Sequence, residues 1–393
     1  MSAILMNRNY PAPRVVKVQG SPYEMGIQHG RQLVDLIQRS KSSVESSYKR
    51  AGLTGEKLAL VLATNEKQIE DTVPNLIEEL KGVADGSGMT YLDILAIYLS
   101  PEIQSALPLH EILQRQSDAP RNTSLGCTAF LAWGKATTDG SPILAQTRDS
   151  SPSGVTSRII VVAKPRGGNS YVAHSRPTLN GGYGVNSKGV TLAAPTVYTS
   201  DSISPLKSGQ PSGLTDSTIS KLVMERCGSV QESLKYAVSR PGGYMGLNIL
   251  LLDRQGNAAK IERSYSSSNT EIPTPDQWPE SHLLAVTNHF TSTEMKNLGP
   301  PESDPKFEQV WNSYRRHRRI TNLLRSSAGN IDLAKFRTFT RDHLDGPSDR
   351  SICRHGNSIC TNSAFIVEPS KRRLHVLTGT PCQNDYRTFD CPS

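Results

Sequence analysis

TSLGCTAFLAW, residues 123–133, marks the point where the sequence changes from helical to strand periodicity. Upstream of it, apolar residues recur every three or four positions, which is typical of amphipathic helices. Downstream, short segments rich in apolar and β-branched residues alternate with turns, as in PILAQTRD (142–149) and SRIIVVAKP (157–165). A further helical stretch and more strands follow. This order predicts a layered α+β core instead of alternating βαβ units.

The helical segment before residue 123 carries its own boundary signals. The stretch 21–37, SPYEMGIQHGRQLVDLI, opens with a capping box of Ser21 and Glu24 around a proline. Gly86 and Gly88 predict the end of a later helix. Residues 106–125 lose their periodicity and predict a linker or an exposed loop.

Composition sets outer limits on the protein class. The chain has 393 residues, 36% of them hydrophobic and 20% charged, which allows a sizeable core in one large or two ordinary domains. Its six cysteines are too few for a disulfide scaffold. No apolar run approaches the roughly 18 residues that span a bilayer, and neither a signal peptide nor a peroxisomal tripeptide is recognisable. We therefore expect a cytoplasmic protein with free thiols.

Cys127 follows a glycine at the head of the first strand, and two interpretations of it remain open. It is either a buried structural cysteine or a nucleophile. If the bond between Gly126 and Cys127 were cut, the new α-amine, with a reference pKa of about 7.7–8.0, would be a general base on the same residue as the thiol. N-terminal nucleophiles work in this way. The unbranched Gly126 would also let the thiol reach the preceding carbonyl.

The segment CRHGNSIC (353–360) contains Cys353, His355 and Cys360, which are metal-ligand types. A zinc site needs four ligands, or three and a water, and no second pair is near in sequence. We therefore predict no metal. Cys382 and Cys391 are an alternative disulfide pair near the C-terminus.

The densest basic cluster, YRRHRR, spans Tyr314–Arg319. A solvated helix face is the first interpretation, and binding of coenzyme A phosphates is the functional alternative. No nucleic-acid-binding motif surrounds the cluster, so we expect no nucleic-acid partner. His289 invites a metal or general-base interpretation, but a histidine satisfied in the core or at the surface is the simpler one, and His29 is expected to pack the first helix against the sheets.

Six segments, in order, resemble the isopenicillin N acyltransferase family (acyl-CoA:6-aminopenicillanate acyltransferase and its relatives). The resemblance covers residues 19–380 and rests on these blocks: SPYEMGIQHGRQL, IEELKGVADGSGMTYLDILAIYL, GCTAF, PILAQTRD, GVNSKGVTLAA and VTNHF. It implies the N-terminal nucleophile hydrolase αββα sandwich, with two stacked antiparallel sheets between helical layers. It also implies a precursor that cuts itself before the cysteine, leaving residues 1–126 and 127–393 as a heterodimer within one domain.

The same resemblance assigns roles to individual residues. Cys127 is the implied nucleophile and, through its α-amine, the base. Asp149, which would otherwise be read as a strand-end surface carboxylate, matches the residue that orients this amine, and Asn288 matches the asparagine that stabilises the oxyanion. Further implied pocket residues are Ser264, Gln146 and Thr128.

The chain departs from the family pattern at three places. Thr147 stands where the family has asparagine, and Ala129 stands where it has threonine. The family's late Ser-Arg pair has no clear counterpart, although Arg354 lies in that region. These departures bear on the substrate and on the rate of self-cleavage.

The sequence thus predicts a self-processing acyltransferase that moves an acyl group from a thioester or amide to an amine through a cysteinyl thioester. A coenzyme A thioester is the expected co-substrate, with no resident cofactor and no membrane partner. An amidohydrolase that releases amines from N-acyl or β-alanyl conjugates is the alternative within the class. A non-enzymatic, unprocessed binding module with the same fold is the alternative outside it, and a nucleic-acid-binding protein using residues 314–319 is the weakest.

Overall fold

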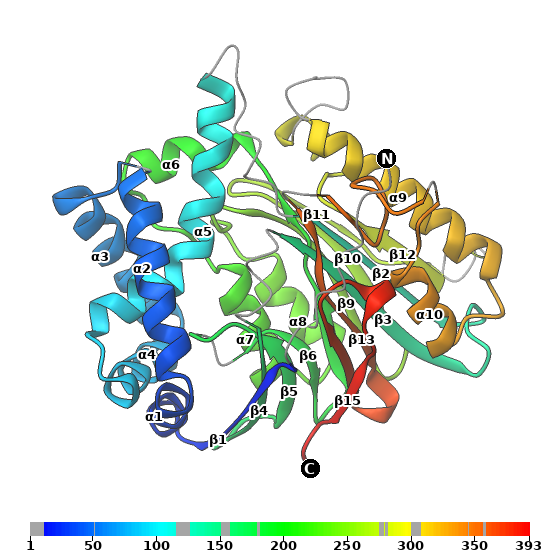
Figure 1. The fold of residues 1–393 in the computed structure, drawn as a ribbon, viewed down its shortest axis with the longest axis horizontal. Helices are drawn as coiled ribbons and strands as arrows, with labels where there is room; N and C mark the ends of the chain where they lie inside the picture. The colour runs from blue at the N-terminus through cyan, green and yellow to red at the C-terminus, as the bar shows by residue number, and fades with distance from the viewer. Residues whose placement is uncertain are drawn as a thin grey trace.

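A computed structural model describes residues 12–50, 52–114, 126–150, 158–178, 181–274, 279, 282–299, 308–344, 346–356 and 359–393. Two β-sheets pack face to face, and helices cover the outer side of each (Figure 1). The predicted αββα sandwich is therefore confirmed. No helix in these ranges combines the length and the apolar character needed to cross a bilayer.

The larger sheet has nine strands. Its strand order is β1 (Arg14–Gly20), β4 (Ile159–Pro165), β5 (Tyr171–Ser175), β6 (Tyr183–Asn186), β7 (Val190–Ala193), β9 (Gly246–Asp253), β10 (Ala258–Arg263) and β11 (Ser268–Glu271), with β8 (Thr196–Val197) paired to β9. The pairing of β1 with β4 is parallel, and the other pairings are antiparallel. The expectation of purely antiparallel sheets is wrong at this one edge, because β1 comes from the distant N-terminal segment.

The smaller sheet has six strands, all antiparallel. Their order is β12 (Leu283–Val286), β2 (Gly126–Gly134), β3 (Gly140–Ser150), β13 (Cys360–Glu368), β14 (Arg373–Thr378) and β15 (Arg387–Asp390). The hairpin between β2 and β3 sets the register that matters for the site. It places Gly126 opposite Asp149 and Cys127 opposite Arg148.

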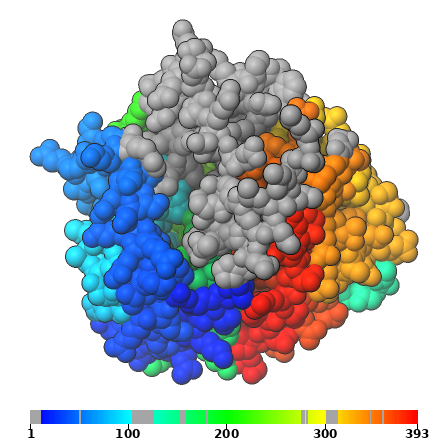
Figure 2. Space-filling model, in the orientation of Figure 1, coloured from blue at the N-terminus to red at the C-terminus, as the bar shows by residue number. Residues whose placement is uncertain are grey.

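The helices form three groups. The N-terminal bundle contains α1 (Pro22–Gln32), α2 (Val34–Arg50), α3 (Gly55–Thr72), α4 (Pro74–Ser87) and α5 (Tyr91–Gln114). The larger sheet is covered by α7 (Asp216–Arg226) and α8 (Val230–Ala237), which follow the short α6 (Ile203–Lys207). The smaller sheet is covered by α9 (Glu308–Ser327) and α10 (Leu333–Thr340). Figure 2 shows the N-terminal helices and the α9–α10 pair on opposite sides of the molecule.

The described residues also include short 3₁₀ turns. They are η2 (Ser200–Ser202), η4 (Lys296–Leu298), η6 (Pro369–Lys371) and η7 (Pro381–Gln383).

Side chains of β2 alternate between two hydrophobic cores. Ala129, Leu131 and Trp133 join the main core between the sheets, whereas Phe130 and Ala132 join a second core beneath α9 and α10. Successive strand residues point to opposite faces. Cys127 therefore shares the inner face, toward the larger sheet.

The predicted helix boundaries are partly confirmed. The Ser21 capping box is present, with the Ser21 N–H donating to Glu24 Oε2 at 2.7 Å. Gly88 ends α4 in the left-handed conformation at φ +71°, but Gly86 lies inside that helix. A side chain at Gly86 would collide with the Ile27 backbone, so this glycine permits close crossing of α1 and α4.

Residues 106–114 of the predicted linker belong to α5, and residues 115–125 lie outside the described residues.

Candidate active site

Cys127 lies near the start of β2 and is 5% exposed. Its backbone N–H donates to Asn288 Oδ1 at 2.9 Å. The geometry is that of an uncut chain, with Gly126 and Cys127 in one continuous strand. Sequence reasoning paired Cys127 with Asn288 across 161 residues, and the structure brings these two residues into contact.

Asn288 lies two residues beyond the end of β12, and the pairing of Val286 with Ala129 brings residue 288 beside residue 127. Its own backbone N–H donates to Ser313 Oγ at 2.7 Å, and its Nδ2 donates to the Thr196 carbonyl at 2.8 Å. A primary amide carries two N–H donors, so the bond to Thr196 uses one of them. Asn288 is thus held from both sheets and from α9, and its orientation at Cys127 is fixed.

Asp149 is 2% exposed and lies opposite Gly126 at the end of β3. Its Oδ1 accepts a hydrogen bond from Thr361 Oγ1 at 2.8 Å, and its Oδ2 lies 3.5 Å from Arg354 Nη1. Asp149 Oδ2 is buried and has no hydrogen-bond partner among the described residues. The surface-turn interpretation of Asp149 is therefore wrong: the carboxylate is buried beside the predicted cleavage bond.

Gly126 is required by this close approach. A Cβ atom built at position 126 would lie 2.6 Å from Asp149 Oδ2 and would also collide with Arg354 Nη1. Any larger residue would force the carboxylate and the guanidinium away from the Gly126–Cys127 bond. The glycine therefore has a steric reason to be there beyond access of the thiol to the preceding carbonyl.

Arg316 is a residue of this site that sequence reasoning missed. It lies on α9, is 1% exposed, and donates to the Cys127 carbonyl, to Thr128 Oγ1 at 2.9 Å and to Asn288 Oδ1 at 2.9 Å. Burial lowers the pKa of Arg316 to about 10, and the Asp149 charge opposes that shift. The Arg316 guanidinium therefore links Cys127 and Thr128 of β2 to Asn288.

The signal that identifies Arg316 is its helical spacing. The buried residues of α9 include Arg316, Ile320 and Leu324, which recur every four positions, whereas Arg315 and Arg318 are exposed. The predicted solvated helix face therefore holds for Arg315 and Arg318 but not for Arg316. Arg316 lies on the apolar stripe, and a charged residue on such a stripe is rarely buried without partners.

The Cys127 thiol sits in a buried but cationic environment. Burial raises the pKa of the Cys127 thiol, while the positive charge of Arg148 directly across the β2–β3 ladder opposes that rise, as does the Gln146 side chain. Gln146 is completely buried, and its Oε1 accepts from the Ala194 N–H at 3.1 Å. In the uncut chain the thiol therefore needs a base before it becomes a strong nucleophile.

The three predicted pocket residues have different surroundings. Gln146 is near the thiol, as expected. Thr128 points to the opposite face of β2 and accepts from Arg316. Ser264 follows β10 and donates to Asp201 Oδ2 at 2.7 Å, so its hydroxyl is not brought into contact with Cys127.

A small cationic cavity of about 20 Å³ lies near the thiol, between the ends of β3, β4 and β5. Its lining includes Arg148, Arg158, His174, Arg176, Tyr183 and Asp216. His174 is 2% exposed, and neither of its ring nitrogens has a hydrogen-bond partner in the described part of the chain. Burial, reinforced by the charges of Arg158 and Arg148, lowers the pKa of His174 well below its usual value.

The arginines of this cavity repel one another. Ile159 pairs with Ser175 in the antiparallel β4–β5 ladder. Arg158, the residue before β4, and Arg176, the residue after β5, therefore lie opposite each other. Like charges placed opposite each other destabilise a sheet. Burial and the charges of Arg148 and Arg176 lower the pKa of Arg158. Such a costly cluster of buried positive charges is typical of a binding site for an anion.

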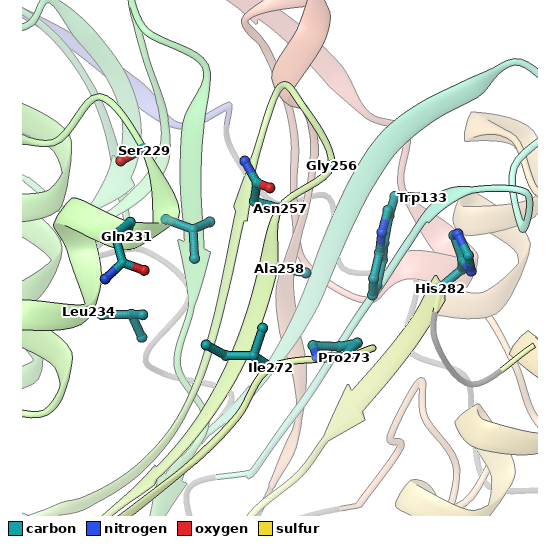
Figure 3. A pocket seen from close by; sticks show the side chains of 11 residues that line it. Trp133, Ser229, Gln231, Leu234, Gly256, Asn257, Ala258, Ile272, Pro273 and His282 are labelled. Carbon is teal, nitrogen blue, oxygen red and sulfur yellow. The ribbon is translucent and has the colours of Figure 1, made fainter. Parts of the chain in front are cut away.

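Another cavity, of about 390 Å³, lies elsewhere (Figure 3). It is lined by Trp133 and His282 on one side and by Gln231, Leu234 and Ile272 on the other. Trp133 is six residues beyond Cys127 along β2, which corresponds to roughly 20 Å in a strand. This cavity therefore does not contain the Cys127 thiol.

The predictions that His289 and His29 are packed histidines are confirmed. His289 is 2% exposed, its Nδ1 lies in a hydrogen bond with Ser313 Oγ at 2.7 Å, and its ring stacks on Tyr314. Burial lowers the pKa of His289 to about 2. His29 is buried against the Pro177 carbonyl, which connects α1 to the larger sheet.

All six cysteines are free. Cys391 Sγ contacts the Ser170 carbonyl at 3.4 Å, whereas Cys382 Sγ lies 3.3 Å from His355 Nε2. The alternative Cys382–Cys391 disulfide is therefore not formed, because the two side chains have different neighbours. In the described residues, the one cluster of metal-ligating side chains includes Cys382 and lies outside the Cys127 site.

The chain is similar in sequence to one described protein family and to one curated protein. The family described as acyl-coenzyme A:6-aminopenicillanic acid acyl-transferase matches residues 136–383. An uncharacterized protein of Archaeoglobus fulgidus is 24% identical over 368 residues, which cover 85% of this chain and 58% of that protein. The chain thus spans less than two thirds of the length of that curated relative.

Two solved structures are also similar. The Caenorhabditis elegans ortholog of N-acylethanolamine-hydrolyzing acid amidase aligns with a TM-score of 0.45 and 16% identity, covering 68% of this chain and 100% of that one. Penicillin V acylase from Agrobacterium tumefaciens aligns with a TM-score of 0.41 and 12% identity, covering 64% of this chain and 83% of that one.

Proposed function

Because the chain belongs to the acyl-coenzyme A:6-aminopenicillanic acid acyltransferase family, we propose that it is a self-processing enzyme with Cys127 as its N-terminal nucleophile. It moves an acyl group from a thioester or an amide to an amine. The observation that carries the proposal is the bond from the Cys127 N–H to Asn288 Oδ1 at 2.9 Å, with the buried Asp149 carboxylate opposite Gly126. These groups surround the nitrogen that would become the catalytic α-amine.

Maturation begins when Cys127 Sγ attacks the Gly126 carbonyl carbon. The C–N bond breaks, the nitrogen takes up a proton to become the α-amine, and a thioester joins Gly126 to the Cys127 sulfur. Water then hydrolyses this thioester, leaving a Gly126 carboxylate and a free Cys127. Two chains result, residues 1–126 and 127–393. The parallel pairing of β1 with β4 supports their continued association in one domain, since the first chain supplies an edge strand to the larger sheet.

In turnover, the α-amine of Cys127 takes the thiol proton and the thiolate attacks the acyl carbonyl. Asp149 Oδ2, which is buried without a hydrogen-bond partner in the described uncut chain, then accepts from the resulting ammonium. An Asn288 N–H faces the tetrahedral oxyanion. The leaving thiol or amine takes the proton back from the ammonium, and an acceptor amine subsequently displaces the cysteinyl thioester.

Arg316 and Arg354 act as positioning residues in this scheme. Arg316 holds Asn288 Oδ1 and the Cys127 carbonyl, and Arg354 lies at Asp149 Oδ2. The family's late Ser-Arg pair is missing from this chain, but Arg354 places an arginine at the buried Asp149 carboxylate, which supports the proposal. A non-enzymatic module would have no need for these buried charges around one cysteine.

The cationic cavity supports a substrate that carries a carboxylate. Arg148, Arg158 and Arg176 supply three positive charges, and Asp216 supplies one negative charge among the described lining residues. A volume of about 20 Å³ holds roughly one water-sized group. That space suits a single carboxylate on the acyl group or on the acceptor amine better than it suits the phosphates of a coenzyme A thioester.

The test is to trap the acyl-enzyme. The purified protein is incubated with short acyl-coenzyme A thioesters, some bearing a terminal carboxylate, and the intact mass of the 127–393 chain is measured. The proposal predicts an acyl adduct that disappears when an amine is added, with formation of the amide. If the adduct decays equally fast without an amine, the enzyme is a hydrolase, and if no donor thioester or amide acylates Cys127, the proposal fails.

A further inference from the structure

Four metal-ligating side chains meet in a loop region next to the active site. His343, Cys353, His355 and Cys382 each offer one ligand atom, and these atoms all lie within 4.8 Å of one another. Cys353 is completely buried, and Cys382 is closest to the surface. The cluster is separate from the Cys127 thiol and is not used in the proposed acyl transfer.

Three of the separations, all measured from His355 Nε2, are close to those around one tetrahedral ion. His355 Nε2 lies 3.0 Å from His343 Nε2, 3.3 Å from Cys382 Sγ and 3.6 Å from Cys353 Sγ. Zinc binds imidazole nitrogen at about 2.0–2.1 Å and thiolate sulfur at about 2.3 Å, so ligand atoms on one tetrahedral zinc lie about 3.3–3.8 Å apart. Shifts of a few tenths of an ångström would bring these three separations into the range of a zinc site.

The donor set indicates which metal fits. Two thiolates and two imidazoles form the Cys₂His₂ set of closed structural zinc sites. Magnesium and calcium prefer oxygen ligands, and no carboxylate belongs to this cluster. With four protein ligands, no position is left open for a substrate. We propose that His343, Cys353, His355 and Cys382 bind one Zn²⁺ ion with a structural role.

The fold brings these ligands together from three places. His343 follows α10, Cys353 and His355 lie in the loop before β13, and Cys382 lies in η7. His343 and Cys382 are 12 and 27 residues from His355. The sequence segment 353–360 offered Cys353, His355 and Cys360 and led to a prediction of no metal; the cluster contains the first two, lacks Cys360 and adds His343 and Cys382.

The proposed zinc would fix the loop that holds Asp149. Arg354 lies between two of the ligands, and its Nη1 is 3.5 Å from Asp149 Oδ2. The Arg354 N–H also donates to Thr361 Oγ1 at 2.8 Å, and that hydroxyl donates to Asp149 Oδ1 at 2.8 Å. Asp149 is thus contacted by Arg354, which lies between two of the ligands, and by Thr361 at the start of β13, which the Arg354 backbone contacts. Loss of the ion would loosen this support.

The experiment measures metal content by inductively coupled plasma mass spectrometry. The full-length protein is expressed with added Zn²⁺ and freed of loosely bound metal. About one zinc per chain is expected, falling at least tenfold in Cys382→Ser and in His343→Ala. Cys391→Ser is the matched control and should keep its zinc, because Cys391 lies outside the cluster. Zinc-free wild type, or equal zinc in all four proteins, would overturn the proposal.

A second measurement uses only the wild type, so it does not depend on the folding of variants. Replacement of the metal by Co²⁺ should give the visible bands of tetrahedral cobalt and a thiolate charge-transfer band, and a chelator should abolish both and lower the Tm. A protein whose mass is lower by two hydrogens, with Cys353 joined to Cys382 in a disulfide, would contradict the zinc site. These readouts do not require Cys127 to be active, so they separate failure of the zinc site from failure of the proposed acyl transfer.

Discussion

Replacement of Arg316 by methionine tests whether the α9 arginine organises the nucleophile. Methionine keeps much of the length and apolar contact of the side chain but removes every donor. The Cys127 carbonyl and Thr128 Oγ1 lose a charged donor, whereas Asn288 Oδ1 keeps the Cys127 N–H. A buried acceptor left without its donor costs about 1–3 kcal/mol. We expect a loss of about 2–4 kcal/mol in the free energy of unfolding.

The assay is denaturant unfolding in a Cys127→Ala background, where self-cleavage cannot interfere. Arg318→Met is the matched control, since Arg318 lies on the same helix and is exposed. Its effect should stay within about 0.5 kcal/mol. With Cys127 present, Arg316→Met should also slow self-cleavage by about 10²-fold, because Asn288 Oδ1 and the Cys127 carbonyl both lose the guanidinium that links them. Equal unfolding midpoints for the two variants, together with normal cleavage, would refute the reasoning.

Further predictions concern the glycine, a buried histidine and the cationic cavity. Gly126→Ala should slow self-cleavage at least tenfold, because its Cβ would displace Asp149; an unchanged rate on denaturing gels would contradict this. The pKa of His289 falls from 6.5 to about 2 on folding, so the unfolded chain binds a proton below pH 6.5 that the folded chain excludes. Stability should therefore decrease by about 2 kcal/mol between pH 7 and pH 5 from His289, and denaturation curves of His289→Gln should show a smaller decrease. Arg158→Gln should reduce the rate of Cys127 alkylation by anionic iodoacetate severalfold relative to neutral iodoacetamide; an unchanged ratio would exclude an anion site beside the thiol.

Local signals in the sequence were sufficient for much of the fold. The Ser21 capping box and the change to strand periodicity near Cys127 both describe short-range chemistry, and the structure contains both. Gly86 was misread because a glycine that ends a helix and one that permits a close helix crossing look alike in sequence. Only the approach of α1 to α4 separates these two roles.

The resemblance to a known family located Cys127, Asp149 and Asn288, whose contacts cross more than a hundred residues. It gave no indication of Arg316, which was hidden in a basic run whose other arginines are exposed. The helical period singles it out only when read together with Ile320 and Leu324. Long-range convergence of this kind depends on tertiary packing, and short-range patterns carry little of it.

The cluster of His343, Cys353, His355 and Cys382 shows the same limit of sequence reasoning. Cys353 and His355 are metal-ligand types, but no second pair of ligands lies close to them in the sequence. The fold supplies His343 and Cys382 from separate segments. Ligand spacing in space, and not in sequence, decides whether four side chains hold one ion.

The most direct test of the central claim is the intact mass of the purified protein and of its Cys127→Ala variant under denaturing conditions. Our account predicts two chains for the wild type, corresponding to residues 1–126 and 127–393, and one uncut chain for the variant. A wild type that remains whole after prolonged incubation would contradict it, because the α-amine of Cys127 would then never form and the proposed base would not exist.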